Sequence, residues 1–198
     1  MGRRTVSRRR GEELEQAILD AVWDEFQEVG FLRLTFEGVA KRAGTSKPVL
    51  YRRWSSRVEM MMACAVSRMP RPDSIPDTGS LRGDIVALLT LMRSRLRIIG
   101  QTAMLALLAE ASNDPELRQK FFRAVVNHLL DLLDMAVWGR AIDRGEIRGE
   151  QLTERLRRLP IDLVRNEFLL FGDLTDEVVA SIVDEVVLPA LRDRGASV

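Results

Sequence analysis

Apolar residues recur three and four positions apart through most of the chain, which is the spacing of one face of an α-helix. The first such run contains Leu14, Ala17, Ile18, Ala21, Val22 and Phe26, and Gly30 follows it as a stop. Nowhere does a strand-like alternation of apolar and polar residues compete with this pattern. The chain is therefore predicted to be all-α.

Three further helices are expected before residue 70. Thr35 is a suitable N-cap, because its hydroxyl can accept a backbone N–H, and Gly44 is a C-terminal breaker. Ser46 caps the next helix, and Pro48 lies in its first turn, where the missing N–H costs nothing. A fourth, connecting helix is expected over about 56–69.

Residues 70–80 contain three prolines and a glycine and few apolar groups, a composition typical of a loop between domains. We place the domain boundary there, with a basic arm and a helix-turn-helix in 1–57 and a larger helical domain in 70–198. In that second region helices are expected over about 81–99, 101–112, 114–144, 151–171 and 175–193. Pro160 is expected to kink the fourth of these.

Composition narrows the possible functions. Of the 198 residues, 46% are apolar and 30% are charged, as in a soluble globular protein, and every stretch of membrane-spanning length carries charge. The single cysteine, Cys64, and the single histidine, His128, exclude an internal disulfide, a multi-cysteine zinc site and any two-histidine site. They also fall in different predicted domains, so neither nucleophilic catalysis nor a cofactor is expected. The N-terminus lacks the apolar run of a signal peptide, which leads us to expect a reducing cytoplasm.

A net charge of +1 hides two basic clusters near the N-terminus. Arg3, Arg4, Arg8, Arg9 and Arg10 form the arm, and Lys47, Arg52, Arg53 and Arg57 form the second cluster. Both are compatible with a polyanionic partner and also with a solvated surface. The arm leaves two alternatives open, insertion into a DNA minor groove or a disordered solvated tail.

Residues 35–54 are predicted to form a helix, a tight glycine turn and a second helix. Val39, Ala40, Val49 and Leu50 are spaced to pack the two helices together. The outward face would then carry Ser46, Lys47, Pro48, Tyr51 and Arg52. Cationic side chains can reach guanine acceptors or phosphates, so this face suits the DNA major groove. The competing interpretation is a purely structural three-helix unit.

This block resembles the TetR family of bacterial transcriptional regulators. The resemblance is carried by Gly30, Thr35, Val39, Ala40, Ala43, Gly44, Ser46, Lys47, Pro48, Leu50, Tyr51, Trp54 and Arg57. By this resemblance Lys47, Pro48, Tyr51 and Arg52 stand where relatives touch bases or nearby backbone, and Thr35, Val49, Arg53 and Arg57 stand at phosphate-contact positions. Valine has no side-chain donor, so a contact through position 49 would be apolar or would use the backbone.

The resemblance also implies a homodimer that represses transcription from a pseudopalindromic double-stranded DNA site and is released by a small-molecule effector. The interface would use the last two helices, and its expected residues are Phe168, Val179, Ile182, Val183, Val186 and Val187. Burial of these residues within the subunit is the alternative. An effector pocket is expected among Met92, Met104, Phe121, His128, Trp138, Asn166 and Phe168, each of which could instead belong to the core. The second domain could also serve only to dimerise or to dock on a protein.

Overall fold

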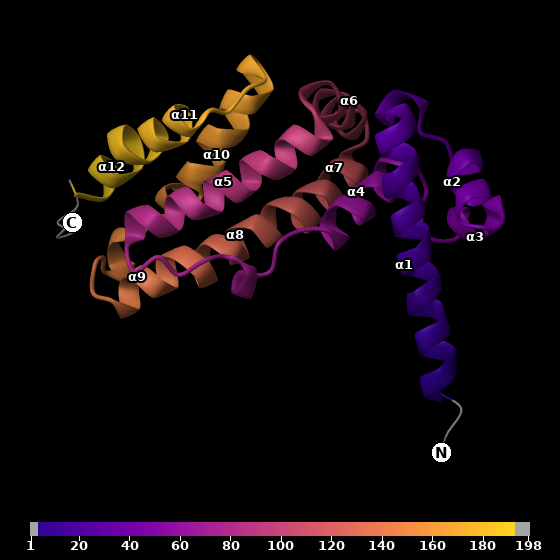
Figure 1. Ribbon diagram of the computed structural model, residues 1–198, viewed down its shortest axis with the longest axis horizontal. Helices are drawn as coiled ribbons and strands as arrows, with labels where there is room; N and C mark the ends of the chain where they lie inside the picture. Colours follow the sequence, from indigo (N-terminus) through magenta and orange to yellow (C-terminus); the bar gives the residue numbers. More distant parts are fainter. Residues whose placement is uncertain (1–3, 193–198) are drawn as a thin grey trace. The chain divides into compact units, whose positions relative to one another are not determined.

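The computed structural model describes residues 4–192, with the backbone alone for residues 4–10, 121 and 122. Every regular element in that range is helical, which confirms the predicted all-α fold (Figure 1). The chain divides into two compact units. The first unit comprises the residues up to 69 together with 106–125, and the second comprises 70–105 and the residues from 126 onward. The chain first passes from one unit to the other at residue 70, at the start of the predicted boundary segment. The division into a DNA-binding domain and a ligand-binding and dimerisation domain stays a prediction.

The longest helix of the first unit is α1 (Arg4–Val29), which ends at Gly30 as predicted. Its buried face begins at Ile18 and continues through Val22 and Phe26. Leu14 and Ala17 are exposed, so the prediction that they share the buried face of this helix is wrong. The backbone of residues 4–10 is helical and continues α1. Arg3 and the arm's side chains lie outside the described residues, so the role of the arm stays a prediction.

Short helices with local caps complete the N-terminal part of this unit. They are α2 (Phe36–Arg42), α3 (Lys47–Tyr51) and α4 (Arg57–Ser67), and a 3-10 turn, Phe31–Arg33, precedes them. Thr35 and Ser56 accept the backbone N–H of Gly38 and Glu59 at 3.1 Å each. Ser46 is the N-cap of α3. Its backbone is extended, and its side chain makes no capping hydrogen bond. The predicted starts of these helices are thus confirmed.

The predicted helix over 114–144 is present, but two π-helical turns divide it. It runs as α7 (Pro115–Phe121), α8 (Asn127–Leu133) and α9 (Gly139–Asp143), joined by the turns Phe122–Val126 and Asp134–Trp138. Asp114 caps it as expected, accepting the N–H of Glu116 and Leu117 at 2.9 and 3.1 Å. A π-helical turn inserts one extra residue and so shifts the face that the following turns present.

The other helices of the C-terminal region have the predicted positions. They are α5 (Leu81–Ile99), α6 (Gln101–Ser112), α10 (Glu154–Phe171), α11 (Asp176–Ser181) and α12 (Leu188–Arg192), with a π-helical turn, Ile182–Val187, between the last two. Pro160 lies buried inside α10, and the predicted kink stays a prediction. Within the second unit α10 contacts α5, α8 and the π-helical turn before α12, and α5 also contacts α11 and both π-helical turns of this unit, so α5 and α10 together form the centre of its core.

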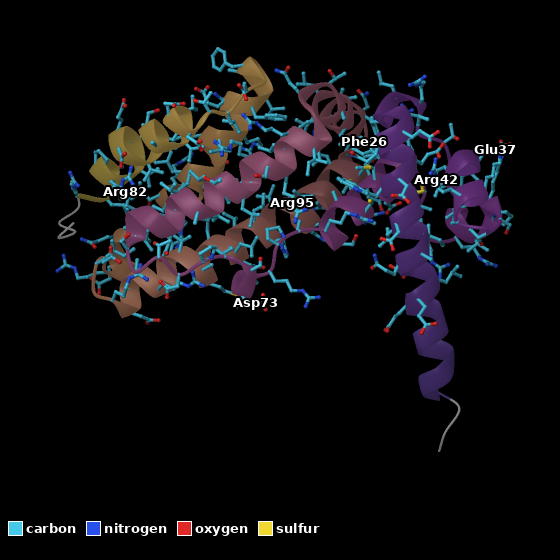
Figure 2. The ribbon with its side chains drawn as sticks, in the orientation of Figure 1. Phe26, Glu37, Arg42, Asp73, Arg82 and Arg95 are labelled. Atoms are coloured by element: carbon cyan, nitrogen blue, oxygen red, sulfur yellow. The ribbon has the colours of Figure 1, made fainter. Side chains whose placement is uncertain are left out.

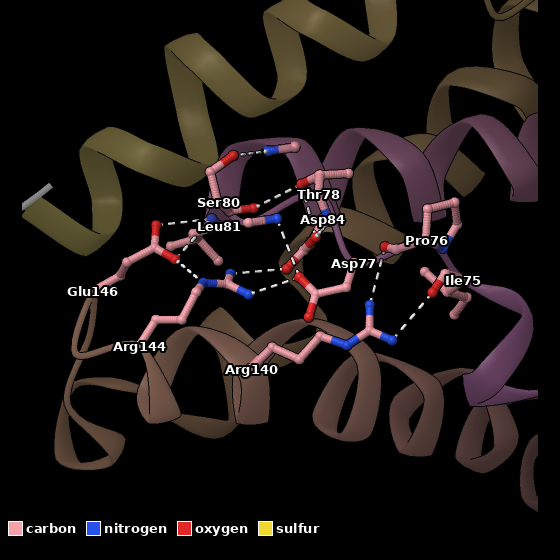
Figure 3. Close-up of polar contacts among 12 residues, drawn as sticks. Ile75, Pro76, Asp77, Thr78, Ser80, Leu81, Asp84, Arg140, Arg144 and Glu146 are labelled. Carbon is pink, nitrogen blue, oxygen red and sulfur yellow. Dashed lines mark hydrogen bonds and ion pairs between the residues drawn. The ribbon is translucent and has the colours of Figure 1, made fainter.

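The segment 70–80 is fastened to the second unit (Figure 3). Arg140 donates to the carbonyl oxygens of Ile75 and Pro76 at 3.1 and 3.0 Å. Arg144 forms ion pairs with Asp77 at 3.1 Å and with Asp84 at 2.8 Å. The segment is therefore held by two arginines at the end of the helical run that closes with α9.

Asp84 is the buried centre of this network, with no exposed side-chain surface. Its Oδ1 accepts hydrogen bonds from the backbone N–H and the hydroxyl of Thr78, each at 2.8 Å. Glu146 pairs with Arg144 at 2.7 Å and accepts the N–H of Leu81 at 2.8 Å. Burial opposes ionisation of Asp84, but the hydrogen bonds from Thr78 and Arg144 outweigh it, so the pKa of Asp84 is lowered.

Across residues 4–192 the helices are too short or too polar for any of them to cross a lipid bilayer.

Candidate nucleic-acid interface

The turn between α2 and α3 fixes the angle between the two helices. Gly44 has φ of +62°, a conformation that residues with a Cβ rarely adopt. The N–H of Thr45 donates back to the carbonyl oxygen of Ala40 at 3.0 Å, which ends α2. Val39, Ala40 and Leu50 are buried as predicted. One face of α3 is thus used for packing, and the opposite face is open.

Most of the predicted DNA-binding residues lie on that open side. Thr35, Ser46, Lys47, Pro48, Tyr51 and Arg52 are exposed. Val49, Arg53 and Arg57 are half-buried. Five of these exposed residues belong to α3 and its two caps, whereas Thr35 is the N-cap of α2. Their roles at DNA stay predictions.

Tyr51 is held in place by an aromatic contact. Its ring stacks on Phe36 of α2 with the ring centroids 4.3 Å apart and an angle of 19° between the planes. The tyrosine nevertheless remains 55% exposed. The stacking restricts rotation of the ring, while the exposed part of Tyr51 stays accessible to a partner.

Lys47 is paired with an acidic side chain that the sequence analysis did not single out. Its Nζ lies 2.6 Å from Oε2 of Glu37. Glu37, which Figure 2 labels, belongs to the first turn of α2. The hydrogen bond and the charge of Glu37 raise the pKa of Lys47, and the same contact lowers the pKa of Glu37. An acidic group therefore lies beside the residues that are predicted to contact DNA bases.

Arg42, the last residue of α2, is a cation with a structural role. Its guanidinium pairs with Glu25 at 3.0 Å and also with Glu28, both on α1. These contacts raise the pKa of Arg42, and the hydrogen bond to Glu28 has the largest effect. Arg42 thus ties α2 to α1, a role that no local sequence signal indicated.

Arg57 is already engaged inside the first unit. Its Nη2 lies 2.6 Å from Oε1 of Glu110, and its Nη1 donates to the carbonyl oxygen of Leu32 at 3.0 Å. The guanidinium also lies over the ring of Phe31, 5.0 Å from the centroid. The predicted phosphate contact of Arg57 would have to compete with these three partners.

Four of the seven predicted effector residues belong to the core of the second unit or pack against it. Trp138 and Phe168 lie in the core of the second unit, and the indole N–H of Trp138 donates to the carbonyl oxygen of Arg157 at 3.1 Å. Met92 is 7% exposed, Met104 packs at the edge of the same core, and Asn166 is exposed. The Nε2 of His128 lies 3.1 Å from the carbonyl oxygen of Pro70. The side chain of Phe121 lies outside the described residues.

The predicted dimer residues are mostly interior. Phe168, Val179, Ile182, Val183 and Val187 belong to the core of the second unit. Val186 is 42% exposed. This packing matches the alternative of burial within the subunit, because the inner face of the last helices is needed to cover α10 and α5. Val186 is the member of the set with a side chain available to a partner.

Comparisons with known proteins agree with this geometry. The model for bacterial regulatory proteins of the tetR family matches residues 18–64, and the model for the tetracyclin repressor-like C-terminal domain matches residues 75–186. The uncharacterized HTH-type transcriptional regulator Rv1556 of Mycobacterium tuberculosis is 34% identical over 168 residues, which cover 83% of this chain and 81% of the relative.

Two further relatives are similar over nearly the whole chain. A DNA-binding transcriptional repressor, TetR, of Mycobacteroides abscessus is 27% identical over 184 residues, covering 92% of this chain and 96% of that protein. The crystal structure of the TetR family transcription regulator SCO0332 has the same fold, with a TM-score of 0.76 at 23% identity over 88% of this chain and 97% of that one. Both domain models, the sequence relatives and the fold lead to one conclusion: the chain belongs to the TetR family and is a transcriptional regulator with a helix-turn-helix DNA-binding domain.

Proposed function

We propose that this protein is a homodimeric repressor that reads a pseudopalindromic operator and responds to a small-molecule effector. The exposed face of α3 is the observation that carries the proposal, because Lys47, Tyr51 and Arg52 meet there beside a rigid glycine turn. A helix of this kind inserts its side chains into the major groove. The printed name of the Mycobacteroides abscessus relative, a repressor, favours repression over activation.

We propose dimerisation because of the way in which helix-turn-helix domains recognise DNA. One α3 presents too few side chains to specify a long site, whereas a twofold dimer presents two copies to two half-sites. Val186, Leu170 and Phe171 are exposed apolar residues on the last helices, at 42%, 64% and 72%. We propose that the partner subunit covers this side of α10 and of the π-helical turn before α12.

The effector is proposed to bind the second unit, where Met92 and Met104 provide deformable apolar surface. The test is to titrate a library of small apolar and aromatic compounds while following thermal unfolding and release of DNA. A ligand at about 100 times its Kd should stabilise the fold by about 2.7 kcal/mol and lower DNA affinity. Compounds that neither stabilise the protein nor release DNA would favour the second candidate function, a regulator whose C-terminal domain only dimerises or docks on another protein. In either case the site of action is proposed to be the cytoplasm.

Arg52→Ala is expected to weaken binding to the selected operator by about 1–3 kcal/mol and to relax one base position, because Arg52 is exposed at the end of α3. Fluorescence anisotropy on selected and random duplexes measures both effects. Arg95→Ala, an equal charge change at an exposed position of α5, is the control and should leave operator binding unchanged. Equal weakening of selected and random DNA by Arg52→Ala would contradict a base-reading role.

A further inference from the structure

The carboxylate of Glu37 lies where a DNA-binding surface should avoid negative charge. Its side chain is 75% exposed, and its partner Lys47 is one of the predicted reading residues. A lone carboxylate facing phosphates would weaken binding to every sequence alike. A contact that only some base pairs can make would turn this general penalty into sequence selectivity.

Glu37 and Lys47 together present an acceptor and a donor side by side. Their Oε2 and Nζ atoms are 2.6 Å apart and come from two helices that the glycine turn fixes relative to each other. In a C·G pair the cytosine N4 and the guanine O6 are hydrogen-bonded to each other, so they stand about 2.9 Å apart. The N4 group has a second hydrogen in the major groove, and guanine offers O6 and N7 as acceptors there. The spacing and the polarity of the side-chain pair thus match those of the base pair.

An A·T pair fits this arrangement less well. Adenine places the N7 acceptor next to its N6 donor, where it would repel a carboxylate. Thymine offers an ammonium one acceptor, O4, beside a methyl group, whereas guanine offers two. The chemistry of the pair therefore favours C·G over A·T.

We propose that Glu37 is a specificity-determining residue that, together with Lys47, reads one C·G base pair in each half-site. This inference rests on the proposed operator binding. Glu37 accepts from the cytosine N4, and Lys47 donates to the guanine of the same base pair. The ion pair in the DNA-free protein holds the two groups at the spacing that the base pair requires, which reduces the ordering needed on binding.

The test uses the full chain as wild type, Glu37→Ala, Lys47→Ala and Glu28→Ala. Each protein is used to select duplexes from a random library, and its affinity is then measured for the wild-type consensus and for every single-base-pair change. Glu28→Ala is the matched control, because Glu28, like Glu37, is an exposed carboxylate paired with a basic side chain in this unit, and Arg42 keeps Glu25 when Glu28 is removed. All three variants change exposed side chains, and their thermal unfolding curves check that they fold.

For the wild type we expect one C·G position in each half-site whose replacement weakens binding about 10- to 100-fold. Glu37→Ala and Lys47→Ala should each reduce that penalty to about threefold or less at the same position and leave the other positions unchanged, because neither group alone matches the pair. The control should behave as the wild type. An unchanged profile for Glu37→Ala, a uniform gain on all DNA, or a selected A·T pair at the sensitive position would overturn the inference. If the wild type enriches no sequence, that result would contradict the proposed operator binding itself.

Discussion

Asp84→Ala is expected to lower the free energy of unfolding by about 3 kcal/mol, because it removes the buried partner of Arg144 and leaves the N–H of Thr78 without its acceptor. The Asp84 side chain has no exposed surface, and it receives hydrogen bonds from Thr78 and Arg144. Without it, Thr78 loses its two hydrogen bonds to α5, and Arg144 keeps only its more exposed acidic partners. Urea denaturation followed by circular dichroism measures the change.

Asp77→Ala provides the matched control for this effect. Asp77 pairs with the same guanidinium at 3.1 Å, but its side chain is 57% exposed. An exposed ion pair contributes about 1 kcal/mol or less. Comparable losses for Asp77→Ala and Asp84→Ala would show that burial of Asp84 is not what makes this contact important.

The contribution of Asp84 should also depend on pH with a defined sign. Because folding lowers the pKa of Asp84, its stabilising effect is present above the unfolded value of about 3.9 and is lost as the pH falls through the folded value. The difference in stability between wild type and Asp84→Ala should therefore be constant near neutral pH and shrink in acid below about pH 4. Denaturation curves from pH 7 to pH 3 test this, and a difference that grows on acidification would reverse the assignment.

Val186→Asp is expected to convert the proposed dimer into monomers and to reduce operator affinity by about 100-fold or more. Val186 is 42% exposed and follows the exposed residues Asp184 and Glu185, so an aspartate there should be tolerated in the isolated subunit. In a dimer it would place an unpaired charge in an apolar contact. Light scattering at micromolar concentration gives the mass, and anisotropy gives the affinity. The same substitution at Val183 would test folding instead, since Val183 is fully buried.

Met135→Asp is the control for this experiment. Met135 is 64% exposed in another π-helical turn of the second unit, and it lies outside the last helices. The variant should remain dimeric and bind the operator normally. A dimer that persists in Val186→Asp with unchanged affinity would place the interface on another face.

The helices and their caps were predictable because their signals are local. Thr35 lies three residues before the N–H that it accepts, and Gly30 and Gly44 end helices through their own backbone conformations. The exposed face of α3 followed from the spacing of the few apolar residues that pack against α2. Such features depend on neighbours within about one turn, which a single sequence displays.

Contacts between distant residues were not predictable in this way. Nothing near Asp84 in the chain indicates that Arg144 will reach it, and the partner of Arg57 is likewise 53 positions away. The apolar composition of the last helix also could not distinguish a face that covers α10 from a face that meets a second subunit. Five of the six residues expected at a dimer interface consequently lie in the core of one chain.

Selection of duplexes from a random library, followed by affinity measurements across salt concentrations, tests the central claim most directly. The account predicts an enriched pseudopalindrome whose half-site centres are separated by about one helical turn, 34–36 Å, and an affinity that falls steeply with salt. Folded protein that enriches no sequence and binds all duplexes alike would contradict the claim that α3 reads DNA.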